Sequence, residues 1–246
     1  MLCRSIWRDV RYFAGLFAAV LSTGHAIAQS PKQCLGSPAA RVSTFPIGSK
    51  QTQVALTASD TPIWKTITVG GSKGVNAVRI AMETASCPIW VNEEADEILG
   101  RPAFPFTETP IELDLVVVSG FELGFGDLIS RSDIELGASV EASLREIYAR
   151  ATSLGFELCP AEVGPALRLK YLNQPLGEFL HIAMKPVARY SGELVDFILG
   201  NGGAGLMLVG GNGHPHVKLP GATRFVFVRP RVDTVAGGVA PDAGGN

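Results

Sequence analysis

The sequence predicts an α+β fold in which a small layer of helices and strands is followed by a C-terminal antiparallel β-meander. Three observations predict this class. Apolar residues recur at helical spacing in two segments, short β-branched or alternating runs recur in several others, and clusters of Gly and Pro separate these runs. Hydrophobic residues make up 46% of the chain, which is enough for a buried core.

The first half of the chain predicts four elements in order. A strand is expected at 63–69 and a helix at 75–86. A short helix at 93–99 should begin at Asn92, which can cap it, and end at Gly100. The β-branched run at 113–118 is typical of a strand that is buried on both faces.

The strongest helical pattern covers residues 139–154. Its apolar stripe is regular, and Gly155 should end the helix. Its outer surface is expected to carry two ion pairs at i,i+4 spacing, Glu141–Arg145 and Glu146–Arg150.

The rest of the domain reads as antiparallel sheet. The clean alternation at 167–171 predicts a strand with Arg168 and Lys170 facing water. Four further strands are expected at 179–184, 194–199, 206–209 and 224–228.

The first 28 residues resemble a secretory signal peptide. Arginines make their beginning positive, residues 12–21 are apolar and uncharged, and Ala26-Ile27-Ala28 forms a cleavage site before Gln29. The apolar run is far shorter than the ~20 residues of a membrane-spanning helix. We therefore expect cleavage and a soluble protein that is periplasmic or secreted.

The remaining chain is expected to have three parts. Residues 29–60 are polar and contain Pro and Gly, as linkers do, and 61–231 should form one α+β domain. Residues 232–246 contain little besides Gly, Ala, Pro and Asp, which predicts a disordered tail.

The charge of the chain argues against nucleic-acid and membrane binding. Three basic residues and one acidic residue leave with the signal, which changes the formal net charge from −2 to −4. No run of Lys and Arg is present. We expect an unknown protein or small-molecule partner, no nucleic acid and no membrane after signal cleavage.

A possible nucleophile lies in the turn 70–74. Gly70-Gly71-Ser72-Lys73-Gly74 matches the G-x-S-x-G turn of α/β-hydrolases, with a strand before it and a helix after it. The partners of Ser72 would be Asp114 or Asp127, and His181 or His214. Too few residues precede Ser72 for the strands that normally come before this turn, and a plain βα turn is the favoured interpretation.

Two histidines could bind a metal ion. His214 and His216 lie two residues apart, and His181 could be a third ligand. Zinc needs three or four converging ligands, so an exposed loop is the simpler interpretation.

The glycine-rich segment 200–205 matches G-x-G-x-x-G. A dinucleotide site needs a helix to open at that loop, whereas a strand follows it here. We interpret the segment as a hairpin turn and expect no cofactor.

The cysteines allow one disulfide after export. Cys34 and Cys87 are the first candidate pair, and separate buried thiols are an equal alternative. Cys159 has no neighbouring group that would activate it, which favours a buried structural thiol. Glu157 and Glu162 could form a carboxylate pair but are more typical of surface charges.

Several stretches together resemble a family of short bacterial proteins to which no function is assigned. The most specific is 157–165, Glu-Leu-Cys-Pro-Ala-Glu-Val-Gly-Pro, followed by 167–171; segments 174–180 and 225–229 add to it. The resemblance implies one folding unit over about 62–231. It also implies neither a fixed serine at 70–74 nor a histidine pair at 212–216.

The leading functional hypothesis is a non-catalytic binding or interaction protein. A serine hydrolase using Ser72 and a metal-binding protein using His214 and His216 remain the alternatives. Two loops are the preferred places for binding residues, Pro160–Pro165 and the glycine-rich turns at 200–213.

Overall fold

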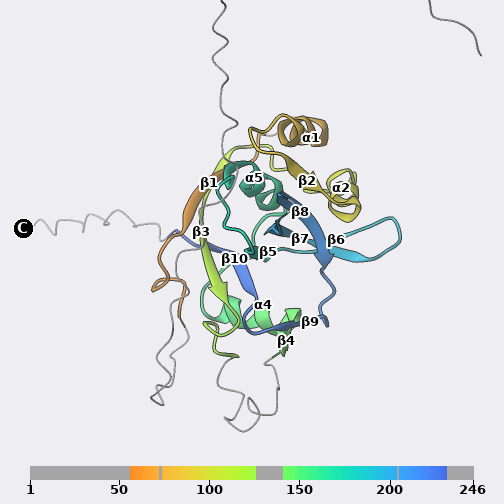
Figure 1. Cartoon of the computed structure of the whole chain (residues 1–246). Helices are drawn as coiled ribbons and strands as arrows, with labels where there is room; N and C mark the ends of the chain where they lie inside the picture. The colour runs from red at the N-terminus through yellow and green to blue at the C-terminus, as the bar shows by residue number, and fades with distance from the viewer. Residues whose placement is uncertain (1–55, 72–73, 126–140, 204, 232–246) are drawn as a thin grey trace, which may run out of the picture. The chain divides into compact units, whose positions relative to one another are not determined.

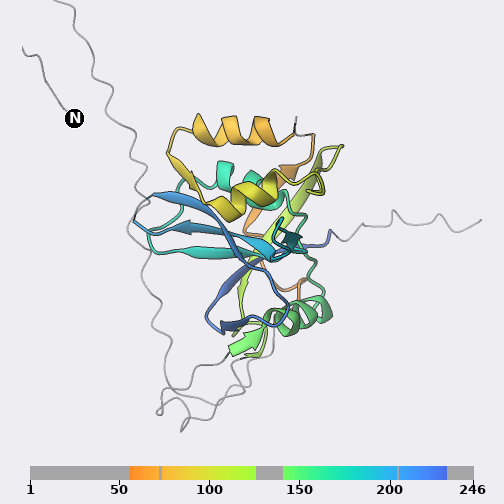
Figure 2. The same cartoon turned by 90° about the vertical axis from the view of Figure 1, so that its right-hand side faces the viewer.

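The fold is built on one mixed β-sheet with helices on both faces (Figures 1 and 2). The structure is a computed structural model that describes residues 56–71, 74–125, 141–203 and 205–231, all of which belong to one compact unit. The α+β class predicted from the sequence is confirmed. None of the helices in these residues is long and apolar enough to cross a membrane.

The sheet curls into an open half-barrel whose strand order is β1-β3-β10-β5-β7-β8-β2, with β6 paired to β7 (Figure 1). A separate two-stranded sheet pairs β4 with β9. The strands are β1 (Lys65–Val69), β2 (Ile89–Val91), β3 (Ile111–Ser119), β4 (Glu141–Ser143), β5 (Phe179–Ile182), β6 (Val187–Ala188), β7 (Leu194–Asn201), β8 (Leu206–Asn212), β9 (Lys218–Pro220) and β10 (Arg224–Arg229).

The C-terminal strands do not form the purely antiparallel meander that we predicted. β5, β7 and β8 are antiparallel neighbours, but β10 pairs with β5 in parallel and with β3 antiparallel. β2 pairs in parallel with β8. Alternation within a strand shows which side chains share a face but not which strand lies beside it.

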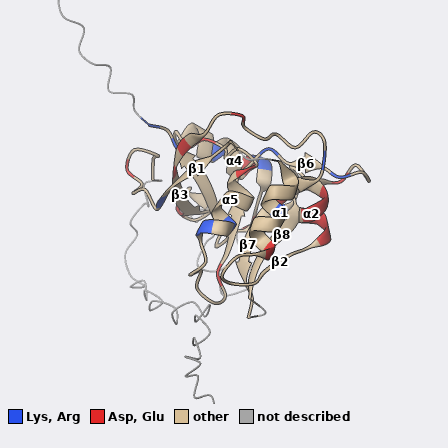
Figure 3. Cartoon of the chain, turned by 90° about the horizontal axis from the view of Figure 1, so that it is seen from above, with Lys and Arg blue, Asp and Glu red and all other residues tan. Residues whose placement is uncertain are grey.

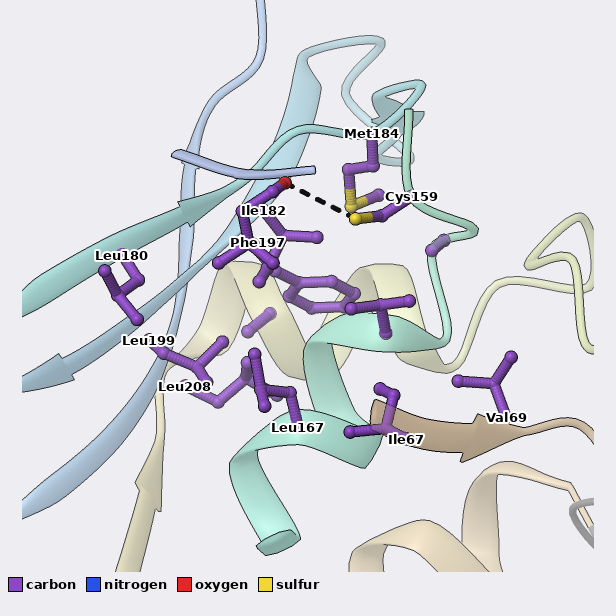
Figure 4. Close-up of a cluster of buried hydrophobic side chains, with 14 of the residues drawn as sticks. Ile67, Val69, Cys159, Leu167, Leu180, Ile182, Met184, Phe197, Leu199 and Leu208 are labelled. Carbon is purple, nitrogen blue, oxygen red and sulfur yellow. Dashed lines mark hydrogen bonds between the residues drawn. The ribbon is translucent and has the colours of Figure 1, made fainter. Parts of the chain in front are cut away.

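Each face of the sheet carries its own core. Helices α1 (Val75–Glu83), α2 (Glu93–Leu99) and α5 (Val163–Lys170) cover one face, and α4 (Leu144–Ser153) covers part of the other (Figure 2). Strand β3 is buried between these cores at Leu115 and Val116, as its β-branched run predicts. Figure 4 shows the first core, where Cys159 donates its thiol hydrogen to the Val226 carbonyl at 3.4 Å.

The short helix α2 begins and ends where the sequence predicts. The Asn92 side chain accepts a hydrogen bond from the Ala95 N–H at 3.0 Å, and Gly100 follows the last helical residue. Its first turn is acidic, which suits the positive end of the helix dipole, and α2 is marked by acidic residues in Figure 3.

Helix α4 is shorter than predicted. Residues 139 and 140 lie outside the described residues, and Glu141–Ser143 form β4 rather than helix. Ser143 and Glu146 form a capping box that starts the helix, and Gly155 follows it as expected, with a φ of 89°. The predicted Glu141–Arg145 helical pair is therefore wrong. In the second predicted pair, Glu146 bonds to Ser143, and Arg150 donates from Nε to the Leu123 carbonyl.

Residues 167–171 are the clearest error of the sequence analysis, because they belong to a helix and its C-cap. Val163, Leu167 and Tyr171 recur every fourth residue and are all buried, so the helical stripe determines the packing. Pro165 lies in the first turn of α5, where its missing N–H has no helical partner to lose. Arg168 is fully buried instead of facing water, and the expected irregular loop over 160–165 ends in this first turn.

Helix α5 approaches β7 closely at Gly164. A Cβ added there would lie 2.5 Å from the Phe197 ring, a distance that real Cβ contacts do not show. We expect Gly164→Ala to lower the free energy of unfolding by about 1–3 kcal/mol through overpacking. Gly100→Ala is the matched control, because there only the flexible end of Arg79 must move. Denaturant unfolding measures both, and equal stabilities of the two variants would contradict the close packing of α5.

Candidate functional site

A groove of about 700 Å³ lies at the N-terminal end of β5. Residues 175–179 and His181 form one side of it, and Pro220 with residues 222–224 forms the other. We call it the β5 groove. Its two sides come from segments about forty residues apart in the sequence, which lie side by side because β10 pairs with β5 in parallel.

Buried polar side chains hold the loop before β5. Gln174 is fully buried and donates from Nε2 to the carbonyls of Glu178 and Leu199, at 3.1 and 3.3 Å. Asn201 donates from Nδ2 to the Gln174 carbonyl at 2.8 Å. Since these bonds join the loop to β7, the wall of the groove is fixed by the sheet.

An ion pair crosses the groove. Arg224 Nη1 lies 2.7 Å from Glu178 Oε1, and the Tyr171 hydroxyl donates to Glu178 Oε2 at 2.8 Å. The Glu178 side chain is only 13% exposed, whereas that of Arg224 is 48% exposed. Glu178 is thus held on both oxygens, and Arg224 remains accessible from solvent.

A second arginine lies buried behind this pair. Arg168 donates to Gln174 Oε1 and to the carbonyls of Tyr171, Gly200 and Met207. Burial lowers the pKa of its guanidinium to about 10, while the charge of Glu178 acts in the opposite direction. Its positive charge is therefore balanced mainly by backbone oxygens.

His181 contributes a neutral ring to the groove. Burial lowers the pKa of its imidazole to about 4, so the ring is uncharged at neutral pH. Its Nδ1 is buried without a hydrogen-bond partner in the described part of the chain, and its ring lies 5.5 Å from that of Phe225. A base with this pKa is poorly matched to proton transfer near pH 7.

Apolar side chains continue from the groove across the sheet. Phe179, Gly200, Met207 and Trp90 are paired in one row across β5, β7, β8 and β2, so they share a face. The Phe179 ring lies over Gly200, where an added Cβ would come within 2.8 Å of it. Phe179 is 47% exposed, and Leu176 beside it is 59% exposed.

The structure describes three of the candidate partners of Ser72, namely Asp114, His181 and His214. Ser72 and Asp127 lie outside the described residues. Asp114 is bound to the Arg231 guanidinium and to the Thr66 hydroxyl, which lower the pKa of its carboxyl to about 2. The hydrolase alternative stays a prediction for which His181 provides only a weak base.

The two loop histidines interact with their neighbours. His214 Nδ1 accepts from the His216 N–H at 3.3 Å, and His216 Nε2 lies 3.0 Å from Arg145 Nη2. Their ring centroids are 5.4 Å apart. Within the described ranges, no three His, Cys, Asp or Glu side chains gather in a way that could hold a metal ion.

The structure describes two of the candidate cysteines, Cys87 and Cys159, and the candidate glutamate Glu162. Cys159 is a buried free thiol whose pKa is raised by desolvation, as expected for a structural residue. Cys87 is buried, but Cys34 lies outside the described residues, so their disulfide stays a prediction. Glu162 is buried rather than on the surface, and it accepts from the Thr107 N–H at 2.8 Å.

Asp196 is a buried acid outside the groove. Neither of its carboxylate oxygens has a hydrogen-bond partner in the described part of the chain, and Oδ1 lies against Gly211. Desolvation raises the pKa of its carboxyl to about 7. The buried hydroxyl of Tyr148 on α4 is likewise unpartnered among these residues, and desolvation and the charge of Asp196 raise its pKa.

Strands β7 and β8 pair antiparallel, with Asn201 opposite Leu206, which agrees with the hairpin predicted at 200–205.

A smaller cavity of about 450 Å³ lies beside the far end of the β7–β8 pair, next to Arg189 and His214. Arg189 is ion-paired with Glu97 at 2.8 Å and with Glu193 at 3.1 Å, so these charges mainly join β6 and β7 to α2.

The fold and the groove define this chain as an α+β protein with a ligand-sized groove on its sheet. No protein-family model, curated protein or solved structure matches the chain. The resemblance drawn from its motifs therefore stays a prediction.

Sequence reasoning identified only His181 among the groove residues. The segment 174–180 belongs to a recognisable motif, but its local pattern predicts no role for Glu178 or Phe179. The alternation at 167–171 predicts a surface position for Arg168. The signal that could have indicated this site is Gln174, directly before the turn at Pro175. A buried loop needs hydrogen-bond partners for its backbone groups, and a Gln side chain can provide them.

Proposed function

We propose that this chain is an exported, non-catalytic protein that binds a small, mainly apolar ligand in the β5 groove. The observation that carries the proposal is the exposed pair Phe179 and Leu176 beside a groove of about 700 Å³. Ligand pockets are commonly about 300–1,000 Å³ and mostly apolar. Export rests on the signal peptide predicted for residues 1–28.

Two features support binding rather than catalysis at this place. The Glu178 carboxylate is already engaged on both oxygens, and the low pKa of His181 makes it a weak base. The loop that carries Leu176 and Phe179 is joined to β7 through Gln174, so the apolar wall is formed before a ligand arrives.

The test uses N-phenyl-1-naphthylamine, a neutral dye whose fluorescence rises in apolar surroundings. We expect it to bind the wild-type protein at one site. Phe179→Ala should weaken binding about tenfold, because loss of a large aromatic contact removes about 1–3 kcal/mol. The fluorescence titration gives both dissociation constants.

Ile80→Ala is the matched control, because Ile80 is 59% exposed on α1 and lies outside the groove. It should leave the dissociation constant unchanged. Absence of dye binding, or an equal effect of both substitutions, would contradict a small-molecule site in the groove. Thermal unfolding of each variant confirms that the fold is retained.

A further inference from the structure

We infer that the ligand of the β5 groove is an amphipathic carboxylate, with an apolar chain or ring and one anionic end that Arg224 binds. This inference rests on the proposed function and adds the chemical class of the ligand. It follows from the charges around the groove, the free donors of Arg224 and the apolar wall beside them.

The charges near the groove are unequal. The groove is lined by one guanidinium, that of Arg224, and one carboxylate, that of Glu178, and the buried guanidinium of Arg168 lies behind them. Arg168 has no carboxylate within ion-pair distance among the described residues, and its partners are neutral oxygens. His181 is neutral at pH 7. The charges of Arg224 and Glu178 cancel within the groove, and the buried charge of Arg168 behind it adds a positive potential, which favours an anion.

Arg224 has hydrogen-bond donors to spare. In the described part of the chain its side chain bonds only through Nη1, to Glu178. A guanidinium has five N–H groups arranged so that one edge can bind a carboxylate through two parallel bonds. Because Arg224 is 48% exposed, its Nε and Nη2 edge can accept an anion while Nη1 stays on Glu178.

The rest of the groove suits an apolar body. Phe179 and His181 are two residues apart on β5 and share a face, and Pro175 and Pro220 line the two sides. An uncharged imidazole and an aromatic ring beside an accessible guanidinium form a site with one polar end. A ligand with one charged end and an apolar body matches this arrangement.

The experiment is isothermal titration calorimetry with octanoate, octanol and octylammonium, which share one chain length and differ in charge. We expect octanoate to bind the wild-type protein about tenfold more tightly than octanol, and octylammonium to bind more weakly than octanol.

Substitutions of the two ion-pair residues should change the affinity for octanoate in opposite directions. Arg224→Gln should weaken octanoate binding about tenfold and octanol binding much less. Glu178→Gln should strengthen octanoate binding, because Arg224 then has no competing carboxylate. Arg224→Lys should give an intermediate affinity, since lysine keeps the positive charge but cannot form two parallel hydrogen bonds to the carboxylate. Arg231→Gln is the control, because it removes a similar surface ion pair, that with Asp114.

The outcomes separate the two proposals. If neither octanoate nor octanol binds, the groove is not a site for small apolar ligands and the proposed function fails with the inference. If both bind equally, or if Arg224→Gln weakens both alike, the groove stands as a binding site and the carboxylate assignment is overturned. Weaker octanoate binding by Glu178→Gln would also overturn it, by showing that the ion pair only shapes the groove.

Discussion

Replacing Arg168 with alanine is expected to lower the free energy of unfolding by about 3 kcal/mol, one of the two largest effects that we predict. The side chain is fully buried and donates to Gln174 and to three backbone carbonyls. Alanine would remove the donor that these acceptors share and open a cavity between α5 and the β7–β8 pair. Relief of the buried charge offsets only part of this loss.

Denaturant unfolding of Arg168→Ala and Lys170→Ala measures the effect. Lys170 is exposed on the same helix, so its substitution should change stability by less than about 0.5 kcal/mol. Arg168→Met retains much of the side-chain volume, so it should lower the free energy of unfolding less than Arg168→Ala does. If Arg168→Ala is as stable as Lys170→Ala, the hydrogen bonds of Arg168 contribute nothing net.

Asp196→Asn is expected to stabilise the protein at pH 8 by about 2 kcal/mol and to have little effect at pH 4.5. The pKa of this carboxyl is about 7 in the folded protein, compared with about 3.9 in an unfolded chain. The folded state therefore binds the proton more tightly, and the stability contributed by Asp196 falls as the pH rises from about 4 to about 7.

The size of this effect follows from the same pKa difference. Three pH units at about 1.4 kcal/mol each give an upper value of about 4 kcal/mol. The asparagine amide also buries polar atoms without partners, so the expected gain is about half of this. The neutral ring of His181 has the opposite effect: the stability that it contributes is present above about pH 6.5 and is lost as the pH falls towards 4. This contribution is the same in the wild-type protein and in Asp196→Asn, so it cancels when the two are compared.

Asp114→Asn is the matched control for Asp196→Asn. Arg231 and Thr66 lower the pKa of Asp114 to about 2, so its charged form favours folding. Asp114→Asn should therefore lower stability at pH 8, the opposite sign to Asp196→Asn. Chemical unfolding at both pH values gives the free energies, and equal signs for the two variants at pH 8 would show that Asp196 is paired in solution.

The site shows how far local patterns reach. The sequence analysis found β5 and its His181, because a run of apolar and β-forming residues marks a strand wherever it lies. It could not find Arg224 as a partner of Glu178, since these residues are 46 positions apart and meet only because β10 pairs with β5 in parallel. Local patterns contain no information on which strands become neighbours.

The sequence by itself determined the α+β class and the elements whose signal is local. These include α1 and α2, the Asn92 cap, the buried strand β3 and the antiparallel pair β7–β8. Tertiary structure alone decided the strand order, the helical state of 163–170 and the burial of Arg168. Five alternating residues fit a strand and a helix equally well, and carbonyls of Gly200 and Met207, more than 30 residues away, make the buried position of Arg168 favourable.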